Sequence, residues 1–131
     1  MINRSADPKR KLIRSIFLGN ISVTEVIDYH LSIVRVFEPG DTVFIYNDLR
    51  KCKFDFEIHD LPIFIETMTM AASKYEMINS VYLTDDPIVT AFMAVYELKV
   101  SHIRNYHICH CSTEKQALEL MKPLDLSRDT R

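Results

Sequence analysis

Two ionisable residues of opposite charge, Asp48 and Arg50, come just after a short apolar run. Residues 43–46 are apolar and β-favouring, and a turn-forming Gly40-Asp41 pair precedes them. A run of this length between turn signals predicts a buried central strand. Ligands of sheets covered by helices tend to bind beyond the carboxyl ends of the strands. We therefore expect Asp48 and Arg50 to lie at a binding edge of the sheet.

A second polar turn extends this candidate site. Thr84 and Asp85 follow the next predicted strand, and the ends of parallel neighbouring strands lie at one edge. The spacing predicts a ligand- or partner-binding crevice that holds Asp48, Arg50, Thr84 and Asp85. Arg50 would be its only fixed positive charge, and its forked donors suit a carboxylate or a phosphate. The alternative is that Asp48 and Arg50 pair with each other in a structural role.

Histidines and cysteines gather near the end of the chain at His102, His107, Cys109, His110 and Cys111. These residue types bind zinc. On a strand, however, residues 107, 109 and 111 share one face at about 6.6 Å from neighbour to neighbour, and residue 110 points away. That spacing is too wide for one ion. We expect no metal, with buried cysteines beside surface histidines.

Two further residues have weaker chemical signals. Cys52 lies among basic residues, which could depress the pKa of its thiol, although an ordinary loop thiol is the alternative. His59 precedes Asp60, as a base would precede an orienting acid, but no serine or cysteine nucleophile is near in the sequence. His30 falls on the apolar stripe of a predicted helix and is expected to be a core histidine.

The composition limits the class of protein. The chain has 131 residues, 47% of them hydrophobic, and a net charge of −2. This predicts a single domain with its own core, and it disfavours a nucleic-acid binder. No apolar run approaches the ~20 residues of a membrane span, and no signal peptide is recognised, so we expect a cytoplasmic location. Only two glycines are present, which excludes the glycine-rich phosphate loops and predicts no nucleotide cofactor.

The elements that must position these residues alternate along the chain. Helix signals include the capping box Ser22 with Glu25, the Asp86-Pro87 entry, and Thr113 with Gln116. The expected strands are 11–18, 42–46, 79–83 and 104–109, and the expected helices begin near 22, 60, 87 and 114. This order predicts an α/β fold with a mostly parallel sheet of four to five strands and about four helices. Residues 1–9 and 125–131 are expected to fray, and 51–57 to cross the surface.

The predicted helix 87–99 is apolar on more than one face. Val89, Phe92, Met93 and Tyr96 form one stripe, and Ile88, Ala91 and Val95 form another. A helix of this kind is buried on two sides, in the core or against a second copy of the chain. The pattern therefore predicts a homodimer in which this helix contributes to the contact.

Four short motifs occur in order between Gly19 and Met121. They are Gly19-Asn20-Ile21-Ser22 before the first helix, Asn47-Asp48-Leu49-Arg50 after the central strand, Asp85-Asp86-Pro87, and Thr113 to Leu118 at the last helix. In this order they resemble the SpoIIAA-like family, a mostly bacterial branch of the STAS and CRAL-TRIO-like domains. The chain departs from the family at Cys111, where a bulky apolar residue is common, and at Leu120, where an aromatic residue is common.

The resemblance implies a cytosolic, non-catalytic regulatory or binding module that acts through protein–protein or small-ligand binding. Some relatives are switched by phosphorylation of a serine at the start of the helix after the central strand. The matching residues 57–61 contain no serine or threonine, so we expect no such switch. The family often begins with an extra edge strand, for which only residues 1–6 are available, so that strand is expected to be short or absent.

Two rival functions stay open from the sequence. One is a small enzyme that uses Asp48 and His59, or the cluster of His107 and Cys109. The other is a carrier of an apolar ligand, by analogy with lipid-binding relatives of the fold. The absence of a nucleophile–base–orienter set in the sequence favours the non-catalytic module.

Overall fold

The computed structural model describes residues 1–122, in which strands and helices alternate. The strands are β1 (Ile2–Asp7), β2 (Leu12–Ser22), β3 (Thr42–Asp55), β4 (Met77–Leu83) and β5 (Tyr106–Cys111). The helices are α1 (Val23–Ile33), α2 (Leu61–Lys74), α3 (Pro87–Val100) and α4 (Glu114–Leu120), and a 3-10 turn η1 (Ile58–Asp60) precedes α2. No helix within residues 1–122 has both the length and the apolar character needed to cross a membrane.

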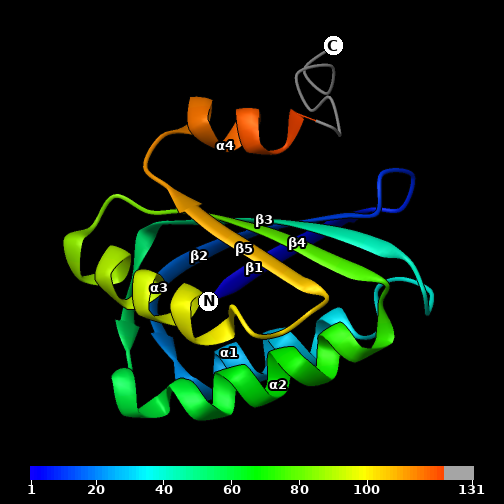
Figure 1. Ribbon diagram of the computed structural model, residues 1–131. Helices are drawn as coiled ribbons and strands as arrows, with labels where there is room; N and C mark the ends of the chain where they lie inside the picture. The colour runs from blue at the N-terminus through cyan, green and yellow to red at the C-terminus, as the bar shows by residue number, and fades with distance from the viewer. Residues whose placement is uncertain (123–131) are drawn as a thin grey trace.

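The five strands form one sheet in the order of the sequence (Figure 1). β2 to β5 are parallel, whereas β1 is antiparallel to β2. This confirms the predicted α/β class with a mostly parallel sheet. Residues 1–9 do not fray as predicted, because all six residues of β1 pair with β2 between Leu12 and Phe17. The expected edge strand therefore forms, and it is short. Backbone hydrogen bonds hold this exposed edge strand, so its side chains need no apolar pattern.

The strand order determines which face each helix covers. Each parallel strand lies beside its predecessor, and a right-handed crossover in a constant direction always returns over the same face. α1, α2 and α3 therefore contribute to one large core on that face. Among residues 1–122, α4 covers the opposite face, where Ala117 and Met121 pack with Leu12 and Val81 (Figure 1).

Two strands run further than their side-chain pattern predicts. β2 continues through Gly19 and Asn20 to Ser22, and β3 continues to Asp55, because the two strands stay paired beyond a register shift near Ile16 and Leu18. The shift lets two residues on β3 oppose one on β2, as in a β-bulge. The expectation that 51–57 crosses the surface is therefore wrong for residues 51–55. β5 likewise begins and ends two residues later than predicted.

The predicted helix entries are largely confirmed. Ser22 and Glu25 form the reciprocal capping box of α1, and the Asp86 carboxylate accepts from two backbone N–H groups at the start of α3. Thr113 caps α4 by accepting from the Gln116 N–H. Asp60 makes no side-chain cap on α2; its carboxylate instead accepts from the Glu57 N–H. The predicted fraying of residues 125–131 lies outside the described residues.

Candidate functional site

The carboxyl ends of the parallel strands carry an open polar hollow. Of the four predicted site residues, Arg50 and Asp85 line it, together with Gly19, Asn20, Lys51, Cys52, Lys53, Asp86 and Pro87. The expectation that Arg50 is its only positive charge is wrong, since the bulged end of β3 also brings two lysines to the hollow. Two aspartates at the α3 entry, Asp85 and Asp86, oppose these cations, so the hollow has mixed charge.

Asp48 and Arg50 pair with each other. The Arg50 Nε and Nη2 donate to the two carboxylate oxygens of Asp48 at 3.0 and 2.9 Å, and Nη2 also donates to Glu114 on α4 at 2.9 Å. These bonds lower the pKa of Asp48 and raise that of Arg50. The guanidinium therefore joins β3 to α4, 64 residues later in the chain, and its charge is balanced by two carboxylates.

Thr84, the fourth predicted site residue, is buried, and its hydroxyl oxygen accepts from Thr90 at 2.9 Å. It thus lies beneath the hollow, where it supports the start of α3. The strand order also explains why no deep crevice forms at this edge. Open α/β sheets bind ligands where the strand order reverses, and the order of β2 to β5 contains no reversal.

We predict that Arg50→Ala destabilises the fold by about 2 kcal/mol, because hydrogen bonds to a charged group each contribute ~1.5–3 kcal/mol. Asp48, whose side chain is only 15% exposed, would lose its partner, and its pKa would rise. Urea unfolding at pH 7 measures the loss, and NMR titration of the carboxyl group measures the shift.

Glu114→Gln is the matched control, because its side chain is 65% exposed and an exposed ion pair contributes less than ~1 kcal/mol. It should leave stability nearly unchanged. If Arg50→Ala is as stable as the wild type, Asp48 needs no partner in the folded chain. That result would favour a ligand-binding role for Arg50.

The histidine–cysteine cluster is divided between the faces of β5, as predicted. His107 is exposed on the same face as Cys109 and Cys111, whose thiols are half-buried with pKa values raised by burial. His110 is on the other face, where its Nδ1 lies 2.5 Å from Glu97 of α3. No group of three or more His, Cys, Asp or Glu side chains within residues 1–122 is arranged to hold a metal ion.

Cys52 and His59 lie in contrasting surroundings, one buried and one exposed. Cys52 is a buried residue of β3 rather than a loop thiol, and burial raises its pKa to about 12, so its thiolate is scarce at neutral pH. His59 is exposed beside Glu57 and Asp60, at 3.4 and 3.6 Å. The enzyme alternative rests on Asp48 with His59, or on His107 with Cys109, and stays a prediction.

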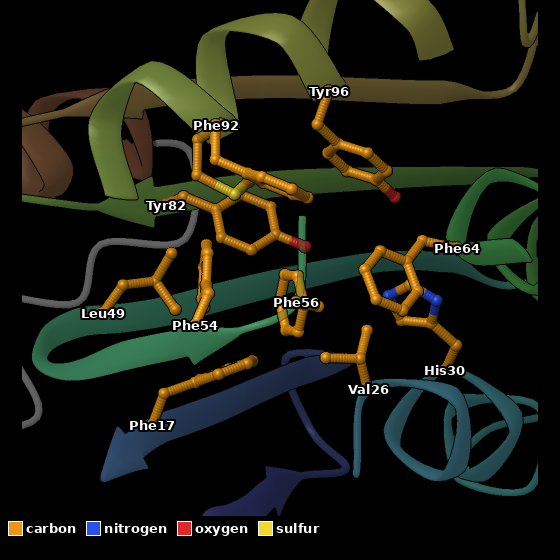
Figure 2. A pocket seen from close by; sticks show the side chains of 11 residues that line it. Phe17, Val26, His30, Leu49, Phe54, Phe56, Phe64, Tyr82, Phe92 and Tyr96 are labelled. Atoms are coloured by element: carbon orange, nitrogen blue, oxygen red, sulfur yellow. The ribbon is translucent and has the colours of Figure 1, made fainter. Parts of the chain in front are cut away.

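The site that the sequence interpretation missed is an aromatic cavity between the sheet and helices α1 to α3 (Figure 2). Its free space is about 30 Å³. Its lining residues are Phe17, Val26, His30, Leu49, Phe54, Phe56, Phe64, Tyr82, Phe92, Met93 and Tyr96. The available signal was the pair Phe54 and Phe56, whose alternation is too weak on its own to predict that the strand continues.

His30 lies in the core, as predicted. Its side chain is at the rim of this cavity. It is 3% exposed, and its Nδ1 lies 2.7 Å from the Thr67 hydroxyl on α2. Because that hydroxyl donates to the Phe64 carbonyl, it accepts from the imidazole N–H. Burial lowers the pKa of His30 to about 4, so the ring is neutral at pH 7.

Family models and curated proteins were compared with the chain. No family model matches the chain, and no curated protein matches it. We therefore infer its function from the side chains and surfaces described above.

Proposed function

We propose that this chain is a cytoplasmic, non-catalytic binding module of the SpoIIAA-like, STAS-like type that works as a homodimer through α3. The mostly parallel sheet with three helices on one face supports this class, as do the four motifs named above. The observation that carries the proposal is the outer face of α3. Ile88 and Leu98 on this helix are 79% and 71% exposed, the highest values among the large hydrophobic residues within 1–122.

Three exposed apolar residues of α3 and the partly buried Val95 form a stripe, which we call the α3 stripe: Ile88, Ala91, Val95 and Leu98. Its members recur at intervals of three and four residues, so they lie on one side of the helix. The opposite side is formed by Val89, Phe92, Met93 and Tyr96, which are buried in the core. The predicted second apolar face therefore exists, and Val95 is its one member that also packs against the core described for residues 1–122.

A second copy of the chain fits this stripe by symmetry. In an antiparallel pair of α3 helices centred on residue 93, Ile88 of each chain meets Leu98 of the other, and Ala91 meets Val95. Such a two-fold contact is self-complementary, and the alanine permits close approach of the helices. Lys99 would lie beside the Asp85-Asp86 turn of the second copy, so charges would also be complementary. The alternative occupant of the α3 stripe is a partner protein that has an apolar helix. The test below distinguishes such a partner from a second copy of the chain.

We predict that Leu98→Glu converts the dimer to a monomer, because two carboxylates would be buried at the ends of one contact. Sedimentation velocity at about tens of micromolar protein should show a dimer for the wild type and a monomer for the variant, with unchanged circular dichroism. Leu118→Glu is the matched control, since Leu118 is 43% exposed on α4, and should leave the dimer intact. A monomeric wild type would refute the homodimer.

The alternative of an apolar-ligand carrier is favoured by a separate observation, the aromatic cavity. The cavity is lined by the inner side of α3, whereas the proposed dimer uses the outer side. One molecule can therefore both form the dimer and bind an apolar ligand.

A further inference from the structure

We propose that the aromatic cavity is a binding site for small, neutral aromatic molecules that carry one oxygen acceptor, and that the Phe56 ring occupies the ligand's place in the free chain. This inference does not depend on the homodimer. It rests on the chemistry of the lining, on one buried hydroxyl without a partner, and on how Phe56 is held.

The lining excludes charged ligands. Phenylalanine, tyrosine, leucine, valine and methionine surround the space, and His30 is the one titratable base among the lining residues, neutral at pH 7. A charge in such a site would lose its hydration without gaining a counter-ion. The cavity also has no room for a long chain, because its free space of about 30 Å³ is that of about two water molecules. A compact uncharged molecule remains.

One polar group of the cavity lacks a partner. The Tyr96 hydroxyl is buried and points toward the side where Phe64 lies (Figure 2). The Tyr106 hydroxyl is its neighbour, but Tyr96 makes no hydrogen bond of good geometry within residues 1–122. The hydroxyls of Ser80 and Tyr106 are in the same condition. Buried polar groups are normally satisfied. Burial raises the pKa of Tyr96 well above 10, so it keeps its proton and can donate to a ligand oxygen.

Phe56 closes the outer side of the cavity. It follows the last residue of β3, so no strand partner holds its backbone. Its ring stacks on Phe54 at 4.6 Å between centroids and meets the rings of Phe64 and Phe92 edge-on at 4.8 and 5.2 Å. A phenyl group of a ligand could make the same three contacts. Displacement of Phe56 by such a ligand would leave a ring-shaped space against Phe54, Phe64 and Phe92.

The probes are acetophenone, which has a ring and a carbonyl oxygen, and ethylbenzene, which has nearly the same shape without the oxygen. Calorimetric titration measures their affinities, and NMR shifts locate them. Phe56→Ala should bind acetophenone at least about tenfold more tightly than the wild type, since the ligand ring no longer competes with the side chain. Ethylbenzene should bind about three- to tenfold more weakly than acetophenone, the contribution of one neutral hydrogen bond.

Tyr96→Phe should bring the two probes within twofold of each other, because it removes the donor and keeps the ring. Phe37→Ala, which truncates a buried ring outside the cavity, should gain no affinity. If Phe56→Ala is unfolded alone, acetophenone should restore its native spectrum, as a ligand of the folded state does.

Several results would overturn the proposal. One is that neither probe binds to Phe56→Ala at millimolar concentration. Another is that the NMR shifts caused by the probes are confined to residues outside the cavity. An oxygen preference that survives in Tyr96→Phe would do the same. Tighter binding of decanoate would instead indicate a lipid site, and tighter binding of tetramethylammonium a cation cage.

Discussion

The wild-type protein is expected to lose about 2 kcal/mol of stability between pH 7 and pH 5, because of one buried histidine. The pKa of His30 falls from 6.5 in the unfolded chain to about 4 in the folded one. Between these values the unfolded chain binds more protons, so stability is complete above pH 6.5 and falls as the pH decreases. The total loss by pH 4 is on the order of 3 kcal/mol. Urea unfolding at a series of pH values measures it.

His30→Gln is the control, because a glutamine amide can still donate to Thr67 but does not take up a proton. The variant should lose less than ~1 kcal/mol over the same interval, whatever its stability at pH 7. The carboxyl groups of Asp7, Glu25 and Asp48 have lowered pKa values, so their contributions are lost at lower pH than this window. Equal losses in wild type and variant between pH 7 and pH 5 would contradict the assignment.

The second large effect is expected at Asn47, in the centre of the sheet. This side chain is 0% exposed, and its carbonyl oxygen accepts from the Tyr29 hydroxyl at 2.7 Å. Tyr29 in turn lies 2.5 Å from the buried Ser15 hydroxyl. Asn47→Leu should destabilise the fold by about 2–3 kcal/mol, because it leaves a buried tyrosine hydroxyl without its acceptor. Denaturant unfolding at pH 7 gives the value.

A double-mutant cycle tests the network. Tyr29→Phe alone should cost about 1–2 kcal/mol, yet the double variant should cost at least ~1 kcal/mol less than the sum, since both partners are then apolar. Tyr75→Phe is the control, because its hydroxyl donates to the Ile33 carbonyl outside this network, and its effect should add to that of Asn47→Leu. Additivity of Tyr29→Phe with Asn47→Leu would show that the hydrogen bond contributes nothing.

The sequence was sufficient for features that depend on residues close together in the chain. The capping box of Ser22 and Glu25 and the Asp86-Pro87 entry are interactions over three or four positions, so residue types alone reveal them. The alternation of apolar runs with helical stripes likewise determined the α/β class, because burial of one face imposes its period on the sequence. His30 could be placed in the core for the same reason.

Only the tertiary structure decided the contacts between distant residues. The pairing of Arg50 with Glu114 depends on where α4 returns over the sheet, and no local pattern encodes that distance. Residues 51–55 alternate too weakly to predict a strand, and they are extended because backbone bonds to β2 continue past the bulge. That extension places Phe54 and Phe56 against Phe92 of α3. The aromatic cavity therefore arises from the order and length of the strands, which hydrogen bonds between segments determine and side-chain periodicity does not.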